Sequence, residues 1–323
     1  MQGAINSMAG KTCLVTGATA GIGAVTAREL ARRGATVIIV GRSRERCQAS
    51  VEAIRQETGN TGLEWLQADL SSQAEIRRLA KEFRDRHCRL DVLVNNAGAL
   101  FELRRESVDG IEMTFALNHL GYFLLTHLLL DTLKASAPSR VVVVSSEAHR
   151  DIKAFDFDDP EARARASWRG AYTDSRFRSL FYSLVIPWAH PAFLQYAHTK
   201  LANLLFTYEL ARRLAGTGVT ANALHPGLVA TNFSGGEGVY SWFMRRLTRW
   251  FGVSPEDGAK TTVYLATANE VGNVTGQYFV KEKPADSSAA SHDPDAARRL
   301  WQLSERMTAI DISAHAALRR GGG

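Results

Sequence analysis

Two residues that could take part in proton transfer, Tyr196 and Lys200, stand four positions apart in the stretch YAHTK. In a helix this spacing places both side chains on one face. A free tyrosine has a pKa of about 10 and is a poor base at neutral pH, whereas a nearby ammonium group favours the phenolate and lowers that pKa. The pair is therefore suited to proton transfer. The alternative is an ordinary polar face of an amphipathic helix.

A glycine-rich stretch near the start of the chain could hold a phosphate. Residues 16–23 read TGATAGIG and lie between an apolar run and a helical pattern. At the start of a helix the unpaired N–H groups and the positive end of the helix dipole favour an anion, such as the pyrophosphate of a nucleotide. The position of the glycines, after a first strand and before a first helix, predicts a dinucleotide site. An ordinary glycine turn is the alternative.

The elements that must position these residues alternate between strand and helix patterns. A strand at 12–17 precedes a helix at 22–33 that stops at Gly34, and a second strand at 35–41 precedes a helix at 43–59. Apolar strands separated by helices indicate a parallel sheet covered on both sides, which is the doubly wound (Rossmann) α/β fold. We expect further strands at 63–70, 90–98, 140–146, 219–227 and 276–280, and long helices at about 110–135 and 196–214.

The composition narrows the class of protein. Hydrophobic residues make up 45% of the 323 positions, enough for a sizeable core. No apolar run reaches the roughly 18–20 residues of a membrane span, and the start lacks the apolar core of a secretory signal, so we expect a cytoplasmic protein. The net charge of +6 suits an anionic cofactor better than a nucleic acid, because the arginines alternate with glutamates along helices. The three scattered cysteines and the unpaired histidines predict neither a disulfide framework nor a metal site.

Further motifs follow the glycine stretch in a characteristic order. They are NNAG at 95–98, Asn118 in ALNHLGYF, Ser146 in VVVVSSEAH, the YAHTK stretch and HPGLVAT at 225–231. Together with the pattern Thr-Gly-x-x-x-Gly-Ile-Gly, these motifs resemble those of the short-chain dehydrogenase/reductase family over nearly the whole chain. The stretches at 118–149, 198–227 and 276–307 look most like retinol-dehydrogenase-like members of that family.

The resemblance implies a role for each motif residue. Tyr196 would be the general acid/base, Lys200 would lower its pKa and bind the nicotinamide ribose, Ser146 would hold the substrate oxygen, and Asn118 would support a proton-relay water. Ser145 competes with Ser146, because strand neighbours point to opposite faces, and the family pattern favours Ser146. Besides Tyr196 and Lys200, the residues implied to bind the cofactor are Gly17, Thr19, Gly21, Ile22, Gly23, Arg42, Asp69, Leu70, Asn95, Ala97, Gly98, Pro226, Gly227, Val229 and Thr231.

The charge at the end of the second strand favours NADP(H) over NAD. An NAD enzyme usually carries a carboxylate here for the ribose 2′-hydroxyl, but this chain has Gly41 followed by Arg42. A carboxylate would repel a 2′-phosphate, whereas the guanidinium group of arginine can donate two parallel hydrogen bonds to it. Asp69, with Leu70 beside it, is expected at the adenine edge. The alternative for Asp69 is a helix N-cap.

Two stretches of the chain are unusual. Ser146 and Tyr196 lie fifty positions apart. We interpret the insert between them, at about 151–195, as a lid over the site rather than a segment far from it. A contact between subunits is the alternative. A loop at about 232–254 could pack on the domain, cover an apolar substrate or touch a membrane surface. Both carry large apolar side chains, which predict the walls of an apolar cavity: Phe181, Tyr182, Trp188, Phe193, Trp242, Phe243, Trp250 and Phe251.

We therefore expect one domain at 11–308, preceded by an extension at 1–10 and followed by a disordered tail at 309–323. The expected function is an NADP(H)-dependent oxidoreductase that interconverts an apolar alcohol and its aldehyde or ketone. A reductase of a conjugated C=C bond and a non-catalytic dinucleotide-binding sensor remain alternatives. A homodimer and peripheral contact with a membrane are left open.

Overall fold

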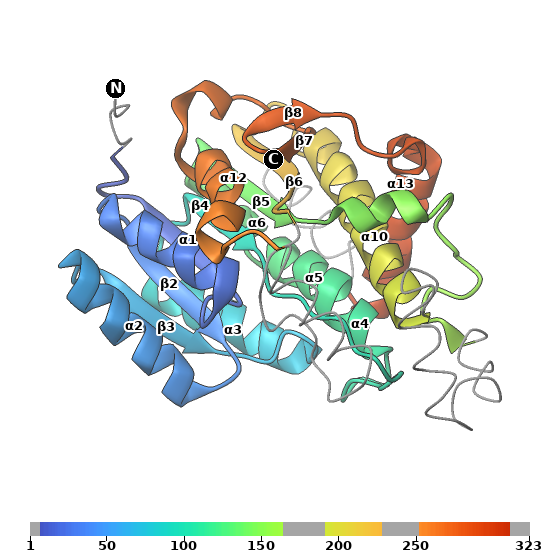
Figure 1. Cartoon of the computed structure of the whole chain (residues 1–323), viewed down its shortest axis with the longest axis horizontal. Helices are drawn as coiled ribbons and strands as arrows, with labels where there is room; N and C mark the ends of the chain where they lie inside the picture. The colour runs from blue at the N-terminus through green and yellow to red at the C-terminus, as the bar shows by residue number, and fades with distance from the viewer. Residues whose placement is uncertain (1–6, 164–190, 228–251, 311–323) are drawn as a thin grey trace, which may run out of the picture.

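A central sheet organises the molecule (Figure 1). The computed structural model describes residues 7–163, 191–227 and 252–310. In these residues an eight-stranded sheet has the order β3-β2-β1-β4-β5-β6-β7-β8, and only the β7–β8 pair is antiparallel. The expected doubly wound α/β fold is thus confirmed. The strands are β1 (Thr12–Thr16), β2 (Thr36–Gly41), β3 (Leu63–Gln67), β4 (Val92–Asn95), β5 (Ser139–Val144), β6 (Val219–His225), β7 (Tyr278–Val280) and β8 (Lys283–Ala285).

Helices cover both faces of the sheet. On one face α1 packs against α2 and α12, and on the other α3 packs against α5 and α10 against α13 (Figure 1). The helical segments are α1 (Gly21–Arg32), α2 (Arg44–Thr58), α3 (Gln73–Arg86), α4 (Met113–Phe115), the π-helix η1 (Ala116–Leu120), α5 (Gly121–Leu128), α6 (Leu130–Ala135), η2 (Glu147–Asp151), α10 (Pro191–Arg213), α12 (Pro255–Thr267), η4 (Asn269–Val271), η5 (Ala289–His292) and α13 (Pro294–Met307).

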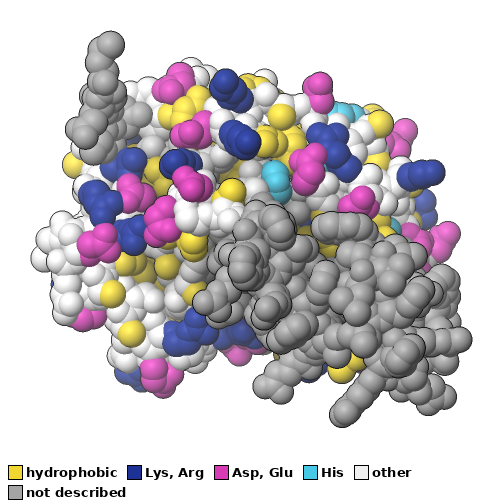
Figure 2. Space-filling model, in the orientation of Figure 1, with side chains coloured by type: hydrophobic (Ala, Val, Ile, Leu, Met, Phe, Trp, Pro, Cys, Tyr) yellow, Lys and Arg dark blue, Asp and Glu magenta, His cyan; other side chains and the backbone are white. Residues whose placement is uncertain are grey.

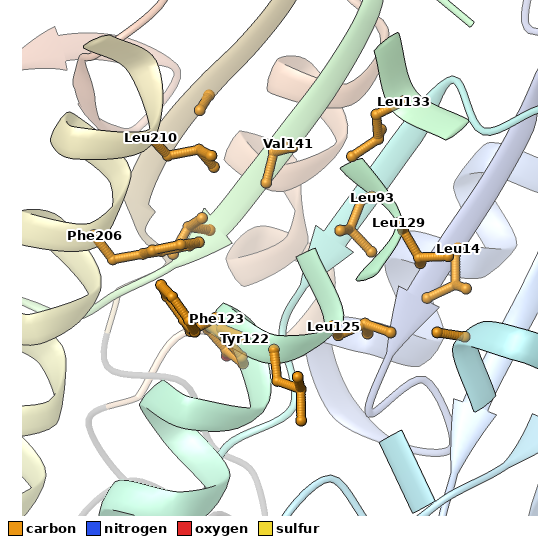
Figure 3. Close-up of a cluster of buried hydrophobic side chains, with 14 of the residues drawn as sticks. Leu14, Leu93, Tyr122, Phe123, Leu125, Leu129, Leu133, Val141, Phe206 and Leu210 are labelled. Carbon is orange, nitrogen blue, oxygen red and sulfur yellow. The ribbon is translucent and has the colours of Figure 1, made fainter. Parts of the chain in front are cut away.

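The alternation of side chains along the strands divides the core into two layers. In β1, Leu14 joins the cluster under α3, α5 and α10, whereas Cys13 and Val15 join the cluster under α1 and α12. Figure 3 shows the first cluster, in which Leu14 and Phe123 lie among other buried apolar side chains. Because both faces of β1 are buried, this strand reads as a continuous apolar run.

The expected long helix at 110–135 is wrong in detail, because the structure divides it. Residues Ala116–Leu120 adopt a π-helical turn between α4 and α5, and Leu129 separates α5 from α6. Apolar periodicity alone does not distinguish an α-helix from one containing a π-turn. Such turns often occur at functional sites, and this one contains Asn118.

The boundaries near the ends of the elements also differ from expectation. Within the described residues, helix α10 already includes Pro191, upstream of the expected start at Tyr196. The antiparallel strand β8 was not expected, because its sequence KPA is exposed and has no apolar pattern. Met8, expected in the N-terminal extension, is buried in the core cluster under α1.

Charged side chains on the surface are paired across elements. Arg28 of α1 contacts Glu57 of α2 and Glu256 of α12. Basic and acidic side chains stand beside one another over much of the face seen in Figure 2. Within the ranges that the structure describes, no helix combines the length and apolarity needed to cross a membrane, and no group of three His, Cys, Asp or Glu side chains could hold a metal.

Candidate active site

The glycine stretch forms the turn between β1 and α1, as expected. Gly17 has a φ of +65°, and a Cβ atom there would lie 2.8 Å from the Cα of Ala97. A Cβ at Gly23 would lie 2.4 Å from the carbonyl oxygen of Gly17, so the first turn of α1 packs directly on the loop. Ala20 precedes the helix and offers no side-chain cap. The N–H groups at this helix end therefore suit an anion such as a pyrophosphate.

The NNAG stretch at the end of β4 is fastened to this turn by Thr16. The Thr16 hydroxyl donates to the carbonyl of Val94 (3.0 Å) and accepts from the N–H groups of Asn96 (2.9 Å) and Ala97 (3.1 Å). The Asn96 amide donates in turn to the Thr16 carbonyl (2.8 Å). Neither Thr16 nor Asn96 was given a role of its own from the sequence, although both lie within the motifs. Their polar character inside an apolar strand run was the available signal.

Asn95 was expected at the cofactor, but its side chain has another partner. It is fully buried and donates to the hydroxyl of Thr126 in α5 (2.8 Å). Ala97 and Gly98 are only partly buried and lie on the loop itself. The side chain of Asn95 thus holds α5 against β4, and the following residues of the motif line the crevice.

The four predicted catalytic residues come from three different parts of the chain. Ser146 follows β5 and precedes η2, Asn118 belongs to η1, and Tyr196 and Lys200 lie on α10. The structure brings Ser146 and Tyr196 together, because the Ser146 side chain hydrogen-bonds the Tyr196 hydroxyl. The Nζ atom of Lys200 lies 5.4 Å from the centre of the Tyr196 ring.

Asn118 lies beside the same lysine. A Cβ atom at Gly98 would be 3.2 Å from the Asn118 Oδ1 and 3.7 Å from the Lys200 Nζ, so both side chains face Gly98. The Asn118 Oδ1 accepts from the N–H of Ala99 (2.9 Å), and its Nδ2 donates to the Ala99 carbonyl (2.9 Å) and to the hydroxyl of Thr199 (3.2 Å). The π-turn of η1 therefore connects the NNAG loop with α10.

The choice between the two serines follows from their contacts. Ser145 is buried, and its hydroxyl donates to the carbonyl of Lys200 (2.8 Å). Ser146 instead carries its hydroxyl toward Tyr196 and accepts from the N–H of Ala148 (3.3 Å). Ser145 thus holds α10 against β5, while Ser146 faces the site.

Lys200 is enclosed by protein groups. It is 2% exposed, its Nζ donates to the carbonyl of Val144 (3.0 Å), and the same atom lies 5.9 Å from the ring centre of Tyr122. Burial lowers the pKa of Lys200 to about 7. The lysine therefore changes charge within the physiological pH range. Tyr122 was not singled out from the sequence because its position is typical of a core aromatic residue.

The pKa of Tyr196 moves in the direction opposite to the one expected. Burial raises it, and the hydrogen bond from Ser146 only partly offsets that rise. Lys200 does not lower it as expected, because burial favours the neutral form of Lys200, and desolvation disfavours the phenolate. In this structure the Tyr196 side chain is a neutral phenol at pH 7.

Close packing at the end of β2 explains why glycine stands at position 41. A Cβ atom at Gly41 would lie 2.7 Å from the Thr19 Cγ2 and 2.8 Å from the Cys47 Sγ. A carboxylate side chain at this position would require one of these neighbours to move. Arg42 is exposed, and its carbonyl accepts from the Gln67 side chain (3.0 Å).

Asp69 is not the helix cap that was considered as an alternative. Its carboxylate accepts from the N–H (2.9 Å) and the hydroxyl (2.7 Å) of Ser71, and Ser72 is the N-cap of α3. Asp69 remains partly exposed, whereas the side chain of Leu70 is buried in the core.

The remaining predicted cofactor residues divide between described and undescribed positions. Pro226 and Gly227 are described and follow β6, where the His225 Nδ1 accepts from the N–H of Glu147 (3.2 Å). Val229 and Thr231 lie outside the described residues. Gly21 and Ile22 begin α1, and Thr19 lies in the loop before it.

A third apolar cluster adjoins the site and includes Tyr196. Ile152 and Phe155, from the first part of the insert, belong to it together with Phe193 of α10. The Phe193 and Tyr196 ring centres are 6.3 Å apart. The described ends of the insert therefore pack beside the catalytic tyrosine. The other aromatic residues of the predicted cavity, Phe181, Tyr182, Trp188, Trp242, Phe243, Trp250 and Phe251, lie outside the described residues.

The fold and the site define an oxidoreductase of the nicotinamide dinucleotide-binding type, with a phosphate-binding turn beside a Ser–Tyr–Lys group at the carboxyl ends of the strands. The family model described as short chain dehydrogenase matches residues 11–154. Human retinol dehydrogenase 13 is 40% identical over 307 residues, covering 94% of this chain and 86% of the relative. The chain belongs to the short-chain dehydrogenase/reductase family.

Solved structures agree with this assignment. A crystal structure of an uncharacterized protein from Mycobacterium paratuberculosis is 33% identical, with a TM-score of 0.69, and covers 94% of this chain and 95% of its own. A short chain dehydrogenase from Burkholderia cenocepacia J2315, solved in complex with NADP, is 25% identical with a TM-score of 0.62. It covers 85% of this chain and 97% of its own.

Proposed function

We propose that this protein is an NADP(H)-dependent oxidoreductase that interconverts an apolar alcohol and its aldehyde or ketone. The observation that carries the proposal is the convergence of Ser146, Tyr196, Lys200 and Asn118 beside the phosphate-binding turn. A non-catalytic sensor would have no need of these four residues in one place.

The protein's own residues supply the proton chemistry. When bound, the nicotinamide supplies or accepts the hydride. The raised pKa of Tyr196 keeps its phenol protonated at neutral pH, which is the form that can donate a proton to a carbonyl oxygen. The Ser146 hydroxyl, hydrogen-bonded to that phenol, orients the same oxygen. Lys200, with a pKa lowered to about 7 and its Nζ 5.4 Å from the centre of the Tyr196 ring, is the nearby group that can return a proton to Tyr196.

The loop residues offer the groups that would hold a dinucleotide. The turn at Gly17 and the uncapped start of α1 provide N–H groups for the pyrophosphate. Gly41 puts no carboxylate at the end of β2, where an added side chain would press on Thr19 and Cys47, and the exposed Arg42 next to it is available to a 2′-phosphate. A related structure was solved with NADP, which supports the same choice of cofactor.

The third apolar cluster supports an apolar substrate. Phe193 of α10 packs beside Tyr196, and Phe155 of the insert belongs to the same apolar cluster. Relatives named retinol dehydrogenase share about 40% of the sequence, and retinol is an apolar alcohol. We therefore place the substrate among medium or long apolar alcohols and carbonyl compounds.

The test is NADPH oxidation, followed by absorbance, with a panel of aldehydes and ketones. Wild-type protein should turn over apolar carbonyls, and Tyr196→Phe should bind NADPH normally but lose most turnover, because it lacks only the transferable proton. Product analysis separates carbonyl reduction from reduction of a conjugated C=C bond. A Tyr196→Phe variant with a near-normal rate at saturating substrate would contradict the mechanism, and a wild type without any activity would favour a sensor.

A further inference from the structure

His149 lies three positions after Ser146 and is fully buried. Its Nδ1 atom is 2.6 Å from the carbonyl oxygen of Ser146. On the opposite side of the ring, the N–H of Ser288 donates to the His149 Nε2 over 3.0 Å. The Tyr278 ring packs in a T-shaped arrangement with the imidazole, with ring centres 5.2 Å apart. The imidazole thus bridges two backbone groups that are far apart in the sequence.

The chemistry of the two partners determines the form of the imidazole. A carbonyl oxygen can only accept, so the Nδ1 atom must carry the hydrogen. A backbone N–H can only donate, so the Nε2 atom must be bare. His149 is therefore neutral with the proton on Nδ1. Burial lowers its pKa and favours this form.

Other hydrogen bonds also connect the η2 segment to residues 278–288 near the C-terminal end of the described chain. The Tyr278 hydroxyl donates to the Glu147 carboxylate (3.0 Å), and the Arg150 guanidinium donates to the carbonyl of Asp286. Of these contacts, only the one through His149 reaches the main chain of Ser146. The C-terminal segment therefore touches the catalytic serine through the imidazole.

We infer that His149 is a positioning residue for Ser146, and that it acts by linking the Ser146 carbonyl to the backbone N–H of Ser288. This inference rests on the proposed function. A catalytic hydroxyl displaced by a fraction of an ångström loses much of its effect on the reaction. The link holds the Ser146 turn in place from a segment about 140 residues away, and a break at either end should release it.

Ser288 allows the link to be cut without altering His149. Its φ is −65°, which proline can adopt. Ser288→Pro therefore removes the N–H donor and places the proline Cδ where its hydrogen stood, so the imidazole loses its partner and is pushed away from the Ser288 backbone. Ser288→Ala is the matched control, because it keeps that N–H. Its hydroxyl has no hydrogen-bond partner within the described part of the chain.

We expect Ser288→Pro to lower kcat about threefold or more, the effect of losing one positioning hydrogen bond, while the Kd for NADPH stays unchanged. His149→Asn keeps a donor near the Nδ1 position but is too short to reach Ser288, and should lower kcat to a similar extent. Because both changes break one link, their effects in the double variant should not add. Ser288→Ala should retain wild-type kcat.

Hydrogen exchange provides a readout that does not depend on turnover. The N–H of Ala148 donates to the Ser146 Oγ, so its protection reports the position of the serine. It should exchange faster in Ser288→Pro than in Ser288→Ala. Equal exchange and equal kcat in these two variants would overturn the inference. A wild type without carbonyl-reducing activity would instead refute the proposed function, and the exchange comparison would still decide the role of His149.

Discussion

The preference for NADPH over NADH can be tested at two neighbouring positions, the exposed Arg42 and the closely packed Gly41. Arg42 is exposed, so Arg42→Asp introduces a carboxylate at the end of β2 without disturbing the packing. A charge-assisted hydrogen bond contributes about 1.5–3 kcal/mol, which corresponds to about ten- to hundredfold in Kd. Solvent screens an exposed guanidinium, so we expect the lower end, a Kd for NADPH weakened about tenfold.

Gly41→Asp places the same carboxylate one residue earlier and has a different cost. Its Cβ would lie 2.7 Å from Thr19 and 2.8 Å from Cys47, and overpacking of this kind destabilises a protein by about 1–3 kcal/mol. Gly41→Asp should therefore lower the melting temperature, whereas Arg42→Asp should leave it unchanged. Cys47→Ala in the Gly41→Asp background should recover part of the loss.

The assay is fluorescence titration of NADPH and NADH with each variant, together with thermal unfolding. Arg42→Asp should weaken NADPH while leaving NADH within about threefold of wild type, less than the effect of one hydrogen bond to a charged group. If wild-type protein binds NADH as tightly as NADPH, the reasoning from Gly41 and Arg42 is wrong. If Gly41→Asp is as stable as wild type, the steric argument fails instead.

Three further predictions follow from buried groups and from the apolar cluster. Lys200→Met should abolish most turnover and weaken the binding of NADPH. It should also raise the free energy of unfolding by about 0.5–2 kcal/mol, because a buried amine is removed. Denaturant unfolding measures this change, and a variant less stable than wild type would contradict the prediction. Burial lowers the pKa of His119 to about 3, so the unfolded chain binds an extra proton between pH 6.5 and 3, and stability should fall as the pH falls through that range. His119→Gln should flatten this dependence by about 1.4 kcal/mol per pH unit, which unfolding curves at several pH values would reveal. Across a homologous aldehyde series, kcat/KM should rise severalfold per added carbon, since a buried methylene contributes about 0.8 kcal/mol, and a flat series would show that Phe155 and Phe193 do not line the substrate site.

The sequence alone determined the class of fold and the places of its motifs. Glycines between a first strand and a first helix, apolar runs separated by helical patterns, and the ordered motifs around Asn118, Ser146 and Tyr196 all depend on local features. A turn needs residues that permit its backbone conformation, and a strand buried on both faces needs a continuous apolar run. These requirements act over a few positions, so they can be recognised from the sequence alone.

Other properties depended on contacts between distant segments. The direction of the Tyr196 pKa follows from burial by α10 and its neighbours, and the π-turn at Asn118 is indistinguishable from an α-helix by periodicity. The close packing of Thr19 and Cys47 around Gly41 involves three separate segments of the chain. The hydrogen bond from Ser288 to His149 connects positions 139 residues apart. Desolvation and close packing are set by every segment that surrounds a group. Only the tertiary structure therefore decided the protonation of the catalytic tyrosine and the support of the catalytic serine.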